Sequence, residues 1–144
     1  MRAEASREIL ASRAEVWKFL SEPYHLADWW PTVSAVHPDT RGFAVGARWQ
    51  VTGPVSPTLF RKAGATGLAI VKVIDLHERV VWTLTGDRFD VEVRLRAVAP
   101  ERTLVTVALE GPWRPEGFGR PRTLPRIAVH RLFELVQTAA SLSG

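Results

Sequence analysis

The side chains able to do acid–base or metal chemistry are few and scattered along this chain. Cysteine is absent, which excludes disulfides, thiolate catalysis and cysteine metal sites. The four histidines are His25, His37, His77 and His130, and no segment supplies three or four metal ligands. His25 and Asp28 have a spacing that orients an imidazole on one helix face, but a surface pair is the plainer interpretation. We therefore expect neither a metal nor a cofactor.

A lysine within an apolar run is the first candidate for chemistry. If Leu68, Ile70 and Ile74 of the segment 65–76 face the core, strict alternation turns Lys72 inward with them. A buried lysine can hold an anionic ligand or exchange a proton with a lowered pKa. A β-bulge in this long strand would turn the side chain outward instead. Lys72 is thus a candidate binding residue, with both orientations open.

The loop 111–125 is the second candidate, because it combines aromatic and arginine side chains with proline and glycine. Trp113 and Phe118 lie in it, directly before a predicted long helix. Such a loop suits a gate that admits an aromatic or anionic ligand. The alternative is an ordinary basic surface loop.

Several function classes find no support in the sequence. There is no G-x-S-x-G nucleophile motif and no glycine-rich phosphate loop. The formal charge is +4 with 16 Arg against 3 Lys, but no arginine cluster resembles a nucleic-acid stripe. The segment His37-Pro38-Asp39 is interpreted as a turn. No apolar run predicts a signal peptide or a membrane span, so we expect no nucleic-acid partner, no membrane insertion and a cytoplasmic location.

The amino-terminal third predicts a strand followed by two short helices. Residues 2–10 alternate loosely as a strand does, and Ser12 with Glu15 forms a capping-box pattern. A helix should follow over 13–21, and a second over 23–29 because Pro23 suits a first helical turn. Two short helices in tandem cannot bury a core alone, so they must lie on another layer.

The remainder predicts a sheet and its cover. Alternating or apolar segments separated by short connections indicate an antiparallel meander with one dry face, over residues 47–53, 65–76, 79–86, 89–98 and 103–111. A helix over 124–142 has apolar side chains on about half of its circumference, broader than a surface helix needs. We expect it to lie in the concave side of the sheet.

The order of these elements resembles the START-like, or SRPBCC, superfamily. The segment ASRAEVWKFLSEPYHLADWWPTV (11–33) is similar to the opening of that family, and VGARW, VIDLHERVVWTLT and APERTLVTVALEG are similar to its later strands. The nearest resemblance is to the bacterial polyketide cyclase/dehydrase-type branch. It implies one α+β domain over 1–144 with the helix-grip fold, a curved antiparallel sheet wrapped around a long carboxy-terminal helix.

The fold so implied predicts an apolar cavity between sheet and helix. Of the adjacent Trp29 and Trp30, which a helix would set about 100° apart, we expect Trp30 to be the inner one and Trp29 to pack beneath a loop. Small side chains on the helix, such as Ala128, should leave space. The expected binding residues are Trp30, Trp49, Lys72, Trp82, Val93, Val107, Ala128, Leu132 and Leu135, with a mouth near Trp113 and Phe118.

Three functions fit this expectation. The first is binding of a hydrophobic small molecule, aromatic, polyketide-like or lipid-like, by a monomer or homodimer. The second is a polyketide cyclase/dehydratase-type enzyme that works mainly by positioning its substrate. The third is a chaperone-activator-like protein-interaction module. A closed apolar pocket favours the first, an inward charged side chain the second, and a filled interior with an exposed apolar patch the third.

Overall fold

The strands of the described residues form one sheet of seven strands, which is antiparallel as predicted. The computed structural model describes residues 1–53, 66–112 and 120–143. The strands follow the order β1-β7-β6-β5-β4-β3-β2 across the sheet. Their bounds are β1 (Arg2–Ile9), β2 (Ala35–His37), β3 (Arg48–Thr52), β4 (Thr66–Asp75), β5 (Arg79–Leu84), β6 (Phe89–Ala99) and β7 (Arg102–Glu110).

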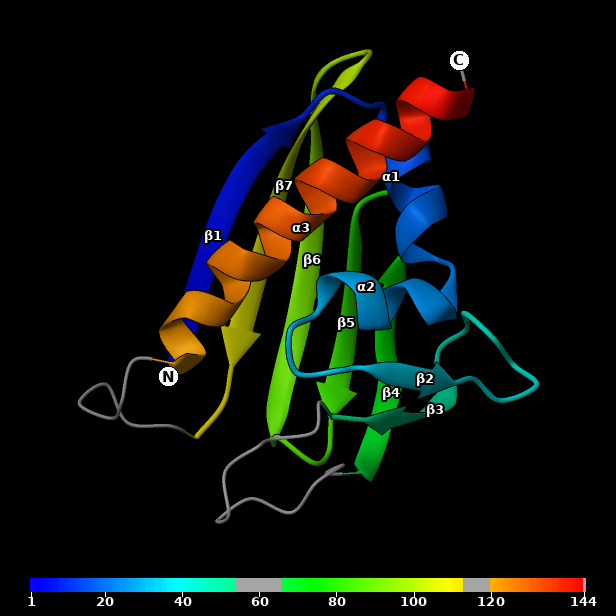
Figure 1. Cartoon of the computed structure of the whole chain (residues 1–144), viewed down its shortest axis with the longest axis vertical. Helices are drawn as coiled ribbons and strands as arrows, with labels where there is room; N and C mark the ends of the chain where they lie inside the picture. Colours follow the sequence, from blue (N-terminus) through cyan, green and yellow to red (C-terminus); the bar gives the residue numbers. More distant parts are fainter. Residues whose placement is uncertain (54–65, 113–119, 144) are drawn as a thin grey trace.

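Helices cover the concave face of the sheet in two parts (Figure 1). They are α1 (Arg13–Leu20), the 3₁₀ turn η1 (Pro23–His25), α2 (Leu26–Trp29) and α3 (Arg120–Ser143). The long helix α3 packs on β1 and β7, while α2 lies over the half of the sheet that contains β4 and β5. This is the helix-grip arrangement, and it confirms the predicted α+β fold class.

Local sequence explains the first helix. Ser12 Oγ accepts a hydrogen bond from the Glu15 amide at 3.2 Å, and Glu15 Oε1 accepts one from the Ser12 amide at 3.1 Å. The capping box is therefore formed as predicted, and it satisfies two amides that the helix itself leaves unpaired.

Other element boundaries differ from the prediction. The expected helix 23–29 is a 3₁₀ turn followed by one α-helical turn, so two short elements replace one. The strand β2 was not predicted, because three residues are too few for an alternation to be recognised. The last helix begins at Arg120 rather than 124, with Pro125 inside it. Its first turn therefore belongs to the segment that the sequence predicts as a loop.

The core lies between the sheet and its helical cover. On β6, Val91, Val93 and Leu95 are buried while Asp90 and Arg94 are exposed, as the alternation predicted. Among the described helices, none is long and apolar enough to span a membrane. The sheet and the helices thus enclose one apolar core, and the side chains in that core are the place to look for a binding site.

Candidate ligand site: the tryptophan cluster

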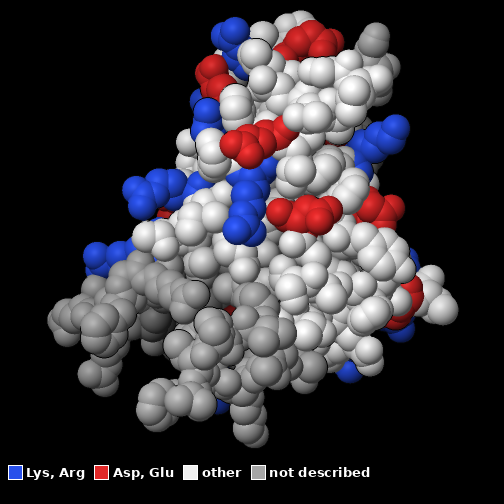
Figure 2. Space-filling view, in the orientation of Figure 1, with Lys and Arg blue, Asp and Glu red and all other residues white. Residues whose placement is uncertain are grey.

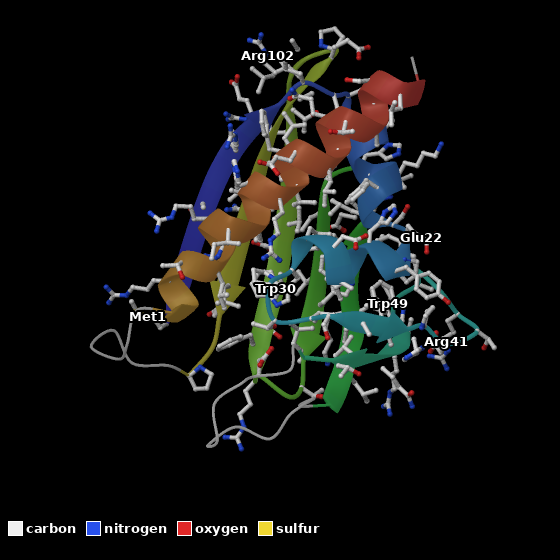
Figure 3. All side chains as sticks on the ribbon, viewed as in Figure 1. Met1, Glu22, Trp30, Arg41, Trp49 and Arg102 are labelled. Atoms are coloured by element: carbon white, nitrogen blue, oxygen red, sulfur yellow. The ribbon has the colours of Figure 1, made fainter. Side chains whose placement is uncertain are left out.

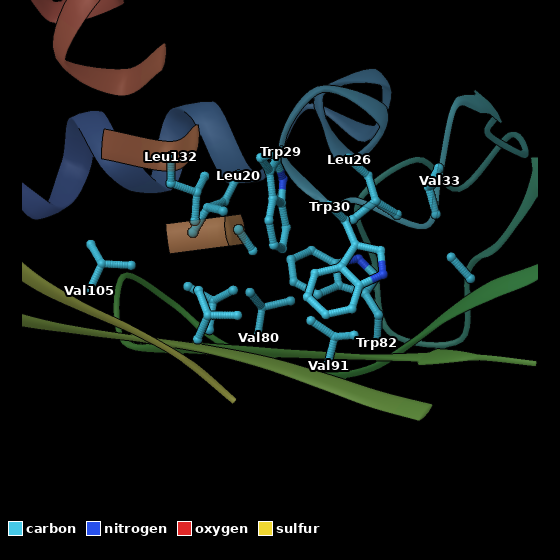
Figure 4. Close-up of a cluster of buried hydrophobic side chains, with 14 of the residues drawn as sticks. Leu20, Leu26, Trp29, Trp30, Val33, Val80, Trp82, Val91, Val105 and Leu132 are labelled. Carbon is cyan, nitrogen blue, oxygen red and sulfur yellow. The ribbon is translucent and has the colours of Figure 1, made fainter. Parts of the chain in front are cut away.

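Tryptophan side chains gather on the concave side of the sheet, and Figure 4 shows three of them, Trp29, Trp30 and Trp82. Trp29, Trp30, Trp49 and Trp82, here called the tryptophan cluster, are each 1% exposed or less. The Trp82 ring on β5 is central: its centroid lies 5.6 Å from that of Trp29 and 6.3 Å from that of Trp49. Phe43 lies 6.4 Å from both Trp49 and Trp82. These tilted pairs have the geometry that aromatic rings prefer.

Both members of the adjacent pair are buried, so the expectation of a single inner tryptophan is wrong. Helix α2 ends at Trp29, and Trp30 has extended backbone angles (φ −92°, ψ 120°). The two side chains therefore do not follow the helical 100° step that the prediction assumed. Their rings meet edge to face with centroids 6.1 Å apart, and Trp29 reaches Trp82 on the sheet.

Two of the indole nitrogens are tied to loops. Trp30 Nε1 donates to Thr32 Oγ1 at 2.7 Å, and Thr32 Oγ1 donates to Asp87 Oδ2 at 2.7 Å. This chain connects the segment after α2 to the turn between β5 and β6. Trp49 Nε1 donates to the Gly42 carbonyl at 2.7 Å. Figure 3 shows Trp30 and Trp49 in the interior, with Met1 and Arg41 at the periphery.

The loop that receives Trp49 is itself anchored by Asp39. Its carboxylate accepts from the Arg48 amide at 2.9 Å and from the Arg41 amide at 3.1 Å. These hydrogen bonds, that from Arg48 first, hold the pKa of Asp39 below its ordinary value. The motif His37-Pro38-Asp39 therefore runs from the last residue of β2 into a loop that supplies Phe43 and the Gly42 carbonyl to the tryptophan cluster.

Trp82 differs from its neighbours in hydrogen bonding. Its Nε1 is fully buried and has no hydrogen-bond partner among the described residues. A buried donor without a partner costs about 1–3 kcal/mol, and buried Trp N–H groups usually have one. The centre of the tryptophan cluster therefore holds an unsatisfied donor, one that an oxygen atom of a ligand or a water molecule would satisfy.

Apart from Lys72, the predicted binding residues that the structure describes lie in one core, where they fill the interior rather than line a hollow. Val93, Val107, Ala128 and Leu132 are each 0% exposed, and Leu135 is partly buried. Ala128, expected to leave space, instead lies packed in the core cluster. The expected mouth residues, Trp113 and Phe118, lie outside the described residues.

Lys72 is exposed, so of the two orientations left open by the sequence the structure has the outward one, and Lys72 does not join the expected binding residues in the core. The pairing of β4 with β5 shifts register between Val71 and Val73, which is the bulge left open by the sequence. Ala69 and Val71 are the buried residues before the bulge, and Ile74 packs on the core after it. Because the bulge changes the phase of the alternation, Ile74 faces inward without bringing Lys72 along.

Charges stay outside the described part of the core. Among the described residues of the core, Thr103 is the one buried polar residue. Figure 2 shows lysine, arginine and acidic side chains interspersed over one face of the surface. No group of three or more histidine or acidic side chains could hold a metal ion in this part. His25 stacks on Phe19 at 4.0 Å and donates from Nδ1 to the Phe19 carbonyl at 2.8 Å, so it contacts α1 rather than Asp28.

The hollows found among the described residues lie at the surface. One of about 540 Å³ separates α1 and η1 from the end of α3, and its apolar floor includes Phe19 and Val136. Another of about 40 Å³ lies beside Thr32 and Asp87, the residues that hold Trp30. Sequence reasoning missed Thr32, Phe43 and Asp87, because loop positions carry no periodic pattern that indicates their direction.

Comparison with known proteins agrees with this architecture. A family described as Activator of Hsp90 ATPase homolog 1-like protein matches residues 10–124. A START superfamily protein from Mycobacterium smegmatis has a TM-score of 0.69 at 12% identity, with 99% of both chains covered. XoxI from Bacillus cereus has a TM-score of 0.70 at 14% identity, with 99% of this chain and 98% of that chain covered.

A Thermus thermophilus protein has a TM-score of 0.70 at 16% identity, with 98% of this chain and 99% of the other covered. No curated protein matches this chain. At these identities the solved structures establish the fold alone. The polyketide cyclase/dehydrase-type branch that the sequence resembled stays a prediction. Because the matched segment spans most of the chain, the protein belongs to the family of Activator of Hsp90 ATPase homolog 1-like proteins, and its fold is that of the START superfamily structure.

Proposed function

We propose that this protein binds a small, mainly aromatic molecule in the tryptophan cluster, and that the ligand carries a hydrogen-bond acceptor. The observation that carries the proposal is the Nε1 of Trp82, unpartnered within the described chain, among indole rings. Aromatic walls with one placed polar group are the usual composition of a small-molecule site. The proposed ligand stacks among these rings and accepts the missing hydrogen bond.

Entry of the ligand requires the tryptophan cluster to open, since its rings are in contact. The hydrogen-bonded chain from Trp30 through Thr32 to Asp87 is the element whose release frees one ring. Because only the open fraction of the protein can bind, the apparent affinity is the intrinsic affinity multiplied by that fraction. We therefore expect modest affinities, and a ligand that is flat and small rather than a long lipid.

A pair of shape-matched compounds tests the proposal. Acetylnaphthalene carries a carbonyl acceptor where ethylnaphthalene carries a methylene group. A neutral hydrogen bond contributes about 0.5–1.5 kcal/mol, so the ketone should bind about 2–13 times more tightly, measured by calorimetry or native mass spectrometry. The variant Trp82→Phe should abolish this preference, because phenylalanine has no donor.

Trp49→Phe is the matched control. It removes a second indole of the same cluster, but its Nε1 already donates to Gly42. The preference for the ketone should survive in this variant, provided that circular dichroism shows a native fold. Failure of both naphthalenes to bind the parent protein, or an unchanged preference in Trp82→Phe, would refute the proposal.

A protein-interaction function is the second candidate, and a different observation favours it. The described interior is filled by side chains, and the matched family takes its name from an activator of a chaperone ATPase. Its test is the ATPase rate of an Hsp90-type chaperone with and without this protein. A rise in rate that Trp82→Phe leaves unchanged would favour this function over ligand binding. The enzyme alternative called for an inward charged side chain, and Lys72, the first candidate for that place, is exposed.

A further inference from the structure

One long strand leaves its outer edge unpaired in the described sheet. β1 stands at one end of the strand order and pairs with β7, and Figure 1 shows it as the outermost strand. It has eight residues, whereas β2 at the opposite edge has three. An edge of this length presents a row of backbone donors and acceptors to any strand that can match it.

The hydrogen bonds at the start of β1 identify which backbone groups are open. The Met1 amine donates to the Gly111 carbonyl at 2.8 Å, and the Gly111 amide donates to the Met1 carbonyl at 3.0 Å. The register then continues one residue at a time from Arg2↔Glu110 to Ile9↔Thr103. In an antiparallel pair the bonded residues alternate, so odd-numbered residues bond to β7. The even-numbered residues therefore direct their N–H and C=O groups to the open edge: Arg2, Glu4, Ser6 and Glu8.

We propose that β1 pairs with β1 of a second copy of this chain, antiparallel, with Arg2 opposite the partner's Glu8. This register also sets Glu4 opposite the partner's Ser6, and by two-fold symmetry it pairs all four edge-facing residues. The two sheets then join into one. Each chain presents the same surface, as a closed dimer requires.

Charge selects this register over its neighbours. Side chains of directly opposite residues lie on the same face of the joined sheet. In any alternative register an even-numbered residue must still lie opposite an even-numbered residue of the partner, so the partner strand can shift only in steps of two residues. One such slip places Glu4 opposite the partner's Glu4, and the other places it opposite the partner's Glu8. Both juxtapose carboxylates, which is unfavourable across a strand pair. The proposed register has oppositely charged residues at its two ends instead.

The side chains concerned are accessible to a partner. Arg2 is 43% exposed and Glu8 is 50% exposed, although each already has ion pairs within the chain, Arg2 with Glu92 and Glu8 with Arg102. On the concave face the same register brings Ala5 opposite the partner's Ala5, and alanine leaves room for the two α3 helices. Arg7 is held on α3, 3.7 Å from the Phe133 ring centroid.

Sedimentation or light scattering over a concentration series tests the proposal, which is independent of the proposed function. The parent should dimerise, and Ser6→Pro should weaken the dimer at least about tenfold. Proline removes an N–H that faces the open edge, and symmetry doubles the loss. Ser6→Ala keeps that N–H and should dimerise as the parent does. Circular dichroism verifies that both variants fold.

Charge reversal gives a second readout that does not depend on proline. Arg2→Glu and Glu8→Arg should each weaken self-association, because like charges then face one another. An equimolar mixture of the two variants restores opposite charges at both ends, and it should form a heterodimer. A parent that stays monomeric throughout, a dimer that survives Ser6→Pro, or a mixture that stays monomeric would each overturn the proposal.

Discussion

A single carboxylate on the convex face should make a measurable contribution to stability. Glu92 is 13% exposed and accepts hydrogen bonds from Arg79 Nε and from Arg2 Nη2, the latter at 3.0 Å. Arg94 Nε lies 3.3 Å from the same carboxylate. Three strands, β1, β5 and β6, are thus connected through one side chain, and the substitution Glu92→Gln removes its charge while keeping its shape.

The expected cost follows from these contacts. Two charge-assisted hydrogen bonds, each about 1.5–3 kcal/mol, are replaced by at best one neutral bond of about 0.5–1.5 kcal/mol. The arginines are 41–46% exposed and regain water, which reduces the loss. We therefore expect the free energy of unfolding to fall by about 1–3 kcal/mol. For a domain of this length, that corresponds to a melting temperature lower by about 3–9 °C.

The pH dependence gives the sign of the effect. Burial raises the pKa of Glu92, but the hydrogen bonds from Arg79 and Arg2 outweigh it and hold that pKa below the ordinary value of 4.5. Between the two pKa values the unfolded chain binds more protons, so the stabilisation is complete above 4.5 and is lost as pH falls through the folded-state pKa. The difference between parent and Glu92→Gln should therefore shrink in acid.

Urea unfolding at neutral and acid pH measures both effects. Glu101→Gln, in the turn between β6 and β7, is the control, because Glu101 is exposed and forms no ion pair with any described residue. It should change the free energy of unfolding by less than about 0.5 kcal/mol. The reasoning fails if Glu92→Gln is equally neutral at pH 7, or if its effect is as large in acid as at pH 7.

Two further substitutions test the interior and the first helix. Thr103→Val should lower the free energy of unfolding by about 1–3 kcal/mol, since the buried Thr103 Oγ1 donates to the Ala11 carbonyl at 2.8 Å. Thr103→Ser keeps the hydroxyl and should unfold closer to the parent in urea; equal losses would exclude the hydrogen bond as the cause. Ser12→Ala should cost about 1 kcal/mol through loss of the helix cap, and Ser12→Asn should recover most of it in thermal melts. A neutral Ser12→Ala would mean that Glu15 alone holds the helix start.

Sequence by itself determined the class of fold and, apart from β2 and the division of the helix predicted over 23–29, the order of elements. The capping box at Ser12 and Glu15, the alternation of β6 and the broad apolar arc of α3 are local patterns, readable because each repeats with the period of its own element. The resemblance to the START-like superfamily also rests on segments of this kind. Single-domain organisation, a cytoplasmic location and the ligand stay predictions.

Only the tertiary structure decided where particular side chains point. A one-residue bulge after Val71 reversed the phase of β4 and sent Lys72 outward, and bulges carry no reliable local signal. The end of α2 at Trp29 allowed both tryptophans inside, although their spacing suggested that one must turn away. The Nε1 of Trp82 is unsatisfied because no described element around it places a hydrogen-bond acceptor within reach. Those elements come from distant parts of the chain, so the sequence of any one segment cannot predict this property.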